Sequence, residues 1–399
     1  MSRIVGDLNP PTRLLCGTGP SNPDPRVLRA LGAPVLGQFD PAFTEIMTEV
    51  MDLARAAFRT ANLRTFAVSG TGRAAMEASF ASLIEPGDRI VVGNCGRFGD
   101  LFADIAGRYG AAVTQVRAEW GRVIHPQAIA DALRAHPAKI VAVVHGETST
   151  GMWQPLDEIG EICRAHGALL VVDAVVTLGG VPVETDAWMI DVCFAGTQKC
   201  LGCPSGMAPI TYSPRAEQAM AARQAPVVSN YLDLTQLQRY WSPERLNHHT
   251  LPTSMTYGLR EALRLVVEER PDARYARHRR AGDALKTGLT AMGLELFGDP
   301  RHRLPMITAV LIPPGIEDEA ARLRLLEEFG VEIATSFGPL RGRVWRIGLM
   351  GYNAELRTVL LVLSGLEHVL RSLGVDVPRR AGVEAAMEAY RLPVAVDGK

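Results

Sequence analysis

Between about residue 40 and about residue 215, short apolar runs alternate with stretches whose apolar residues recur at helical spacing. One such stretch places its apolar residues on a single helical face, namely Phe43, Ile46, Met47, Val50, Ala54 and Phe58. The apolar runs predict strands at 65–68, 89–93, 139–145, 168–175, 191–196 and 208–213. Several of these runs are apolar throughout rather than alternating, which is typical of a sheet covered by helices on both faces. The pattern therefore predicts an α/β fold with a largely parallel sheet.

Helices are expected between these strands at 72–88, 97–111 and 156–167, and Gly167 is the expected C-cap of the third. After about residue 270, strands and helices segregate more, with helices expected at 272–292, 317–329 and 354–373 and strands at 306–312 and 343–351. This change predicts a smaller α+β domain. The first 20 residues are rich in Pro and Gly and predict an extended arm. We expect an N-terminal arm over 1–20, a large domain over 21–270 and a small C-terminal domain over 271–399.

Composition and charge exclude several classes of function. The chain has 399 residues, 47% hydrophobic and 21% charged, as in ordinary globular proteins. Its formal net charge of −1 gives no electrostatic footprint for nucleic acid or for an anionic membrane. Neither a membrane-spanning run nor an apolar signal segment is visible. We expect a cytoplasmic protein with no nucleic-acid or membrane partner.

The cysteines also indicate a cytoplasmic protein. The six cysteines do not form a disulfide framework in a chain of this length, and we expect reduced thiols. Cys200 and Cys203 form a single CxxC pair. A structural zinc site would need a second pair or histidines at ligand spacing. The sequence therefore predicts no metal site, and small-residue packing at this pair.

Ligand-binding residues are expected directly after each apolar run, because open α/β sheets bind ligands at the carboxyl ends of their strands. After the run 65–68 comes "SGTGRAAMEA", in which Gly70, Thr71, Gly72 and Arg73 open a helix. Small residues let the backbone approach a phosphate, and the helix N-terminus supplies N–H groups. The same stretch matches GxGxxA with Asp88 downstream, so a dinucleotide-binding fold is an alternative.

Four further side chains follow later strands. Phe98 offers an aromatic face, Thr148 a hydroxyl, Asp173 an acid and Lys199 an amine. Each alone also fits a core, cap, turn or surface role. Together with a phosphate cradle they suit one cofactor, pyridoxal 5′-phosphate, whose aldehyde forms a Schiff base with a lysine and whose ring nitrogen pairs with an acid.

Stretches that cover almost the whole chain resemble the class V aminotransferases of fold type I, and in particular their alanine/serine–glyoxylate group. These stretches are "GTGPSNPDPRVLRALGAPVLGQFDPAF", "SGTGRAAMEA", "LIEPGD", "HGETSTG", "VVDAV", "GTQKCLGCPSG" and "RIGLMG". Three more resemble the bacterial (S)-ureidoglycine–glyoxylate branch: "GRFGDLFADIAGRYGA", "SNYLDLTQLQRYWSPERLNHHT" and "SFGPLRGRVWRIGLMGY". The resemblance implies a large domain with a mostly parallel seven-stranded sheet and a smaller C-terminal α+β domain.

The resemblance also implies roles for individual residues in cofactor binding. Lys199 and Asp173 would be the catalytic pair, with Lys199 as the Schiff-base residue. Thr71, Gly72, Arg73 and Gln198 would hold the phosphate, Phe98 would stack on the ring, Thr148 would contact the O3′ side and Asp173 the ring nitrogen. Thr250 would reach the phosphate from the partner subunit, so that a homodimer shares its active sites.

Substrate residues are implied in the same way. Arg346 would bind the substrate carboxylate, and Asn247 would face the substrate. Asn247 and Gln38 depart from the Tyr and His of alanine–glyoxylate enzymes and match the ureidoglycine branch. The implied activity is transamination of (S)-ureidoglycine with glyoxylate, giving oxalurate and glycine in purine (allantoin) catabolism. The alternatives are an alanine– or serine–glyoxylate aminotransferase, a pyridoxal-phosphate lyase or desulfurase, a cofactor-binding regulator and a nicotinamide-dependent enzyme.

Overall fold

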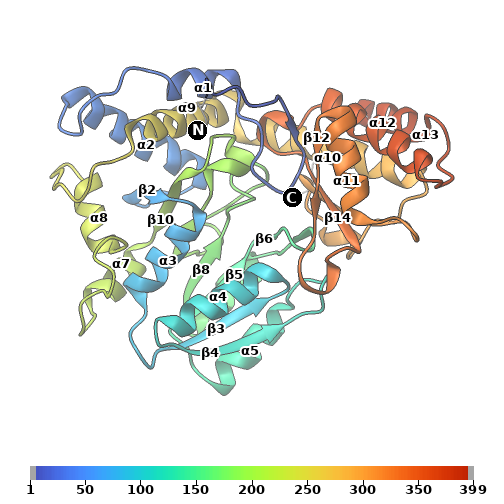
Figure 1. Cartoon of the computed structure of the whole chain (residues 1–399). Coiled ribbons are helices and arrows are strands. Elements are labelled where there is room, and N and C mark those ends of the chain that lie inside the picture. Colours follow the sequence, from blue (N-terminus) through green and yellow to red (C-terminus); the bar gives the residue numbers. More distant parts are fainter. Residues whose placement is uncertain (1–5, 394–399) are drawn as a thin grey trace, which may run out of the picture.

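The computed structural model describes residues 6–393. The first five residues of the expected N-terminal arm and the last six of the expected C-terminal domain lie outside this range. Two bodies are visible in Figure 1: a larger one that holds the main sheet, and a smaller one that holds α10, α11, α12 and α13.

A seven-stranded sheet forms the centre of the larger body. Its order is β2-β10-β9-β8-β5-β3-β4, and neighbouring strands are parallel except where β10 pairs with β2 and β9. The strands are β2 (Arg64–Gly70), β3 (Arg89–Asn94), β4 (Ala112–Arg117), β5 (Ile140–Val144), β8 (Leu169–Asp173), β9 (Val192–Phe194) and β10 (Gly206–Tyr212). Every residue of β5 and β8 is buried. The predicted mostly parallel sheet of seven strands is confirmed.

Helices surround this sheet. They are α1 (Pro25–Leu31), α2 (Pro41–Phe58), α3 (Gly72–Leu83), α4 (Arg97–Arg108), α5 (Pro126–Ala135), α6 (Asp157–Ala165), α7 (Pro214–Ala221), α8 (Leu234–Trp241) and α9 (Thr253–Glu269). In Figure 1, α1, α2 and α9 lie side by side along the upper side of the large body, and α4 and α5 lie at its lower end. The covering on both faces explains why the central strands read as continuous apolar runs.

Helix α2 shows how closely sequence and structure agree. Asp40 accepts a hydrogen bond from the Ala42 N–H, and Pro41 occupies the first turn, where its missing N–H has no intrahelical partner to lose. The predicted apolar face is buried except at Ile46, which is partly exposed. The helix expected at 72–88 instead ends at Leu83. Pro86 follows closely, and a proline disfavours helical geometry in the residue before it.

The smaller body is an α+β unit, as predicted. Its three-stranded antiparallel sheet has the order β11-β14-β13, from β11 (Ile307–Leu311), β13 (Ala334–Thr335) and β14 (Val344–Gly348). Its helices are α10 (Pro271–Ala291), α11 (Asp318–Phe329), α12 (Leu356–Ser372) and α13 (Ala381–Arg391). The apolar core between them consists of residues from 281 to 386 together with Cys16.

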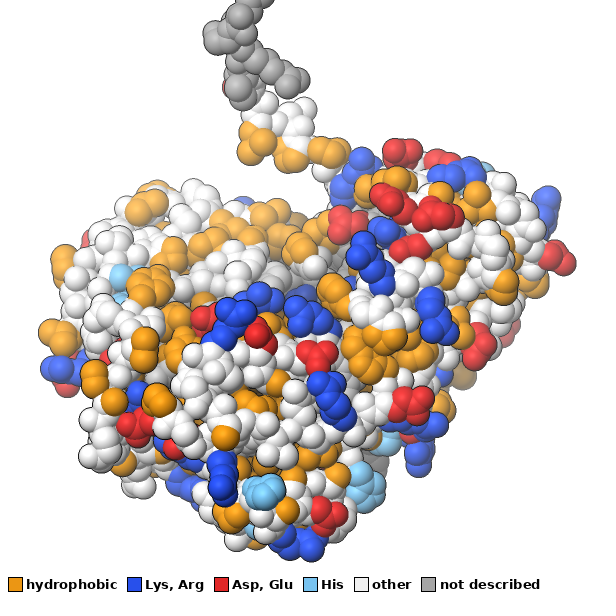
Figure 2. Space-filling model, turned by 60° about the horizontal axis from the view of Figure 1, so that its bottom comes forward, with side chains coloured by type: hydrophobic (Ala, Val, Ile, Leu, Met, Phe, Trp, Pro, Cys, Tyr) orange, Lys and Arg blue, Asp and Glu red, His pale blue; other side chains and the backbone are white. Residues whose placement is uncertain are grey.

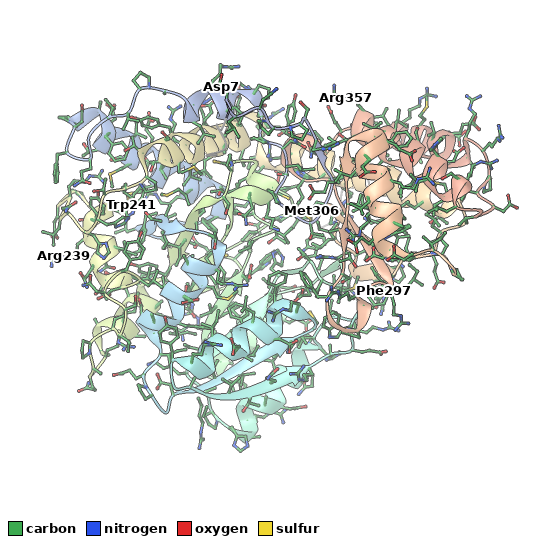
Figure 3. All side chains as sticks on the ribbon, in the orientation of Figure 1. Asp7, Arg239, Trp241, Phe297, Met306 and Arg357 are labelled. Carbon is green, nitrogen blue, oxygen red and sulfur yellow. The ribbon has the colours of Figure 1, made fainter. Side chains whose placement is uncertain are left out.

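The N-terminal segment joins the smaller body. Strand β1 (Leu14–Leu15) pairs in parallel with β12 (Val331–Glu332). The Gly348 N–H donates to the Cys16 carbonyl at 2.8 Å. A small apolar cluster between the two bodies includes Cys200 and Met306, and Figure 3 shows Met306 at their junction, with Trp241 inside the large body. These contacts fix the small sheet relative to the strand ends of the large sheet.

Lys and Arg side chains are interspersed with Asp and Glu side chains over the face of the molecule in Figure 2. No helix within residues 6–393 is long and apolar enough to span a bilayer.

Candidate active site

A cavity of about 380 Å³ lies at the carboxyl ends of the central strands. Its walls come from the turn after β2, the first turn of α4, the ends of β5 and β8, and the segment after β9. The structure places these predicted site residues on its lining: Thr71, Gly72, Arg73, Phe98, Thr148, Asp173, Gln198 and Lys199. Residues scattered over more than 120 positions of sequence therefore meet in one space because their strands end at one edge of the sheet.

The N-terminus of α3 forms one wall. Thr71 is the N-cap residue, and its side chain makes no capping hydrogen bond. A β-carbon on Gly72 would lie 2.7 Å from Val175, so only glycine allows this close approach. Gly70 has φ +139°, a conformation that side chains rarely tolerate. The first N–H groups of a helix have no intrahelical partners, and this end of the cavity is therefore suited to an anion.

Asp173 ends β8 and is only 5% exposed. The Val175 N–H donates to its Oδ1 at 2.8 Å. Burial raises the pKa of Asp173 to about 7, and the negative charge of Glu147 adds to this shift while Lys199 opposes it. The carboxyl group is thus a strong attractor for any cationic group that enters the cavity.

Lys199 lies in a short π-helix, η1 (Thr197–Leu201), which follows β9. Its own backbone is not helical, with φ −106° and ψ −126°, and the segment ends at Gly202 in the left-handed region. Its Nζ donates to the Thr18 carbonyl of the N-terminal segment. Burial is the main reason that the pKa of Lys199 is lowered to about 8, and the positive charge of Arg346 contributes. The amine is therefore close to a useful range for proton transfer near neutral pH.

Three polar or thiol side chains lie next to Lys199 in the sequence or close after it: Gln198, Cys200 and Cys203. Gln198 has a buried Oε1 with no hydrogen-bond partner within the described part of the chain. This amide oxygen is therefore free to accept a hydrogen bond from a donor that enters the cavity. Cys200 and Cys203 are buried free thiols, and burial raises the pKa of each to about 12. Thiols of that kind are poor nucleophiles.

Glu147 is a site residue that the sequence analysis did not name. It lies in β6 (Gly146–Glu147), which pairs with β7 (Met152–Trp153), and it is fully buried. Its Oε2 accepts a hydrogen bond from the Phe98 N–H at 2.9 Å. The available signal was an acid in "GETSTG", two residues after the end of an apolar strand run.

Arg346 lies on β14 of the small sheet and is 4% exposed. Its guanidinium donates to the Thr335 carbonyl at 2.8 and 2.6 Å and to the Thr148 carbonyl at 3.0 Å, and it lies over the Phe337 ring. Within residues 6–393 it forms no ion pair. Burial lowers the pKa of Arg346 to about 10. The arginine is thus a buried cation next to the lining residue Thr148, and it pairs with no carboxylate among residues 6–393.

Four predicted site residues do not line the cavity of their own chain: Gln38, Asn247, Thr250 and Arg346, the last of which contacts the lining residue Thr148. Gln38 Nε2 donates to Asn247 Oδ1 at 3.0 Å on the surface near the start of α2. Thr250 is exposed in the loop between α8 and α9. His249 anchors this loop through a hydrogen bond of 2.6 Å between its Nε2 and the Ser69 hydroxyl.

Among residues 6–393, no three His, Cys, Asp or Glu side chains are grouped so that they could hold a metal ion.

Comparison with known proteins supplies a family. The chain matches the family "Aminotransferase class-V" over residues 30–350. It is 48% identical to the (S)-ureidoglycine–glyoxylate transaminase of Bacillus subtilis (strain 168), over 96% of this chain and 97% of that protein. It is 40% identical to the alanine–glyoxylate aminotransferase of Mus musculus, over 91% of this chain and 89% of that protein. The crystal structure of the ureidoglycine-glyoxylate aminotransferase from Bacillus subtilis matches with a TM-score of 0.96 and 50% identity, covering 97% of this chain and all of that one.

Proposed function

The chain belongs to the class V aminotransferase family and is an aminotransferase, and from this premise we propose that it transfers the amino group of (S)-ureidoglycine to glyoxylate. The products would be oxalurate and glycine, in purine (allantoin) catabolism. The observation that carries the proposal is 48% identity over 96% of the chain to a transaminase of that name, joined to a cavity that holds Lys199 and Asp173.

The cavity fits pyridoxal 5′-phosphate as cofactor. The α3 N-terminus at Thr71, Gly72 and Arg73 suits the phosphate, and Gln198, whose side-chain NH2 group could donate to a phosphate oxygen, also lines the cavity. Phe98 offers a ring face, and Thr148 a hydroxyl. Asp173 would pair with the ring nitrogen, because a buried acid with a raised pKa gains most from a cationic neighbour.

When bound, this cofactor supplies an aldehyde carbon for attachment to Lys199 and an electron-withdrawing ring. The chain's own residues do the positioning and the proton transfer. Lys199 Nζ can take the proton from the substrate α-carbon once the amine is released. With a pKa of about 8, roughly a tenth of such amines are unprotonated at pH 7, far more than for an ordinary lysine.

Arg346 suits the carboxylate that every candidate substrate carries. It is a buried guanidinium whose described partners are neutral carbonyls and an aromatic ring. A carboxylate would supply the missing negative charge and two acceptors in a plane. Arg346 would thus orient both the amino donor and glyoxylate.

We propose further that the enzyme is a homodimer with shared sites. Gln38 and Asn247 are joined to each other, and with Thr250 they lie away from their own cavity. They would act in the partner's site, with Thr250 at the phosphate and the two amides at the substrate. Amides offer both donors and acceptors, as does the ureido group of ureidoglycine.

Alanine–glyoxylate transamination is the alternative, and a relative with that name is 40% identical. The decisive experiment follows the cofactor's absorption during half-reactions with ureidoglycine, alanine and serine side by side. We expect ureidoglycine to react fastest, because unpaired amides in a dry pocket disfavour an apolar analogue. A faster reaction with alanine would overturn the proposed substrate.

The same assay tests the selectivity residues. Asn247→Tyr combined with Gln38→His should slow ureidoglycine sharply and spare or improve alanine. Gln127→His on the exposed first turn of α5 is the control and should change neither rate. Equal loss with both donors would mean that the amide pair serves the cofactor or the fold instead of selectivity.

A further inference from the structure

The first turn of α4 is held by a side chain from a distant strand. The N-cap residue of α4 is Gly96, which makes no side-chain capping bond. The Phe98 N–H instead donates to Glu147 Oε2 at 2.9 Å, and the Arg97 N–H donates to the Ser149 hydroxyl at 3.0 Å. The N-terminal N–H groups of a helix need such partners when they are buried. The turn after β5 therefore caps the helix that carries Phe98.

Both carboxyl oxygens of Glu147 accept hydrogen bonds. Its Oε1 accepts from the Ser149 N–H at 3.0 Å and from the Ser149 hydroxyl at 2.6 Å, so that both of its oxygens serve as acceptors. Burial raises the pKa of Glu147, and these donors oppose the shift. Within residues 6–393 it forms no ion pair. Burying an acid without a cationic partner costs folding free energy. Such an acid is retained where its hydrogen bonds are needed.

The backbone at Gly96, directly before α4, packs closely against Glu147 and Ser149. A β-carbon on Gly96 would lie 2.5 Å from the Ser149 hydroxyl and 2.6 Å from Glu147 Cγ. The backbone at Gly96 is extended, so the glycine is needed here for space. The helix start is thus packed directly against the carboxylate.

The same turn also reaches the small domain. The Thr148 carbonyl accepts from Arg346 at 3.0 Å, and the Ser149 carbonyl accepts from the Ser336 hydroxyl at 2.6 Å. The negative charge of Glu147 raises the pKa of Arg346, against the effect of burial, and also raises the pKa of Asp173. One buried turn therefore contacts the elements that carry the aromatic ring and the arginine.

We propose that Glu147 is a positioning residue that sets the ring of Phe98 and the guanidinium of Arg346 relative to each other. This inference rests on the proposed cofactor site, because the two side chains are expected to face the cofactor ring and the substrate carboxylate. Glu147 touches neither ligand. It acts through the Phe98 N–H and through the turn at Thr148.

The test is Glu147→Gln in the full-length protein loaded with pyridoxal 5′-phosphate. A glutamine must direct its NH2 group at either the Phe98 N–H or the Ser149 donors, which places a donor against a donor. We expect the cofactor dissociation constant to rise about tenfold and the visible circular dichroism of the bound cofactor to fall, since that signal depends on ring orientation. The KM for glyoxylate should rise as well. Glu158→Gln, on the exposed side of α6, is the matched control and should leave all three unchanged.

Ser149→Ala keeps the inference testable if Glu147→Gln does not fold. It removes one donor to Glu147 and the acceptor for Arg97, and should shift the same quantities in the same direction by a few-fold. Cofactor affinity and circular dichroism within twofold of wild type in either folded variant would overturn the proposal, even if the unfolding midpoint fell. A wild-type protein that did not bind the cofactor would instead overturn the proposed function, and this inference with it.

Discussion

The substitution Arg346→Ala tests the role of this arginine in substrate binding separately from the roles of the other site residues. The guanidinium is 4% exposed, and its described hydrogen bonds go to the carbonyls of Thr335 and Thr148. Neither carbonyl carries a full charge. A substrate carboxylate would be the first anion to pair with this cation, so its removal should weaken all carboxylate substrates together.

The magnitude follows from the charge and the burial. A hydrogen bond to a charged group contributes ~1.5–3 kcal/mol, and each ~1.4 kcal/mol corresponds to a tenfold change in rate. Losing one such bond therefore lowers kcat/KM by about 10- to 150-fold, and losing a forked pair lowers it further. We expect the loss for ureidoglycine, alanine and glyoxylate to agree within a few-fold.

The assay is steady-state kinetics for each substrate, with the visible absorption of the cofactor recorded in parallel. Arg343→Ala is the control, because Arg343 is an exposed arginine just before the same strand. It should leave kcat/KM unchanged. A loss in Arg346→Ala that is confined to one substrate would refute the reasoning, since the arginine would then recognise a side group that the other substrates lack.

Three other predictions concern Lys199, Asp173 and Thr250. Lys199→Ala should keep the fold but lose turnover and the covalent capture of cofactor by borohydride, and normal turnover in this variant would contradict the assignment. Asp173 has a pKa raised from 3.8 to about 7 in the folded chain, so the stability of the cofactor-free protein should fall as pH rises from about 4 to about 7, on the order of 4 kcal/mol. Asp173→Asn should flatten that part of a urea-denaturation profile, and an unchanged slope would rule out the shift. Thr250→Ala should weaken phosphate binding although Thr250 lies away from its own cavity, and activity in a verified monomer would exclude a shared site.

The sequence predicted the large sheet well because buried parallel strands have a simple pattern. The run expected at 89–93 is β3 (Arg89–Asn94), and that at 139–145 contains β5 (Ile140–Val144). Each strand contains a continuous apolar run, at 90–92 and 140–144, because helices cover both faces of the sheet. Strand β4 was missed because it lies at the sheet edge, where its residues are exposed or half-buried and no apolar run marks it.

The sequence predicted those site residues that directly follow a strand. Asp173 and Lys199 follow apolar runs, and the sheet brings such positions together. The contact between the Thr18 carbonyl and Lys199 joins residues 181 positions apart, and no local pattern encodes it. Glu147 was missed for a related reason, since its importance comes from donors on α4 that lie 49 positions earlier.

The pairing of β1 with β12 has a consequence for how the protein is made. Leu14 lies opposite Val331 in the pairing, so the ribosome must add 317 further residues, the difference between these positions, before the partner strand exists. At roughly 5–20 residues per second this takes on the order of 16–60 s. During that time Cys16 and its apolar neighbours have no core to enter, because the core that receives them is built from residues 281–386. The N-terminal segment of the nascent chain thus has no strand partner and no apolar core until synthesis is nearly complete. A chaperone that binds exposed apolar segments would act on this part of the chain.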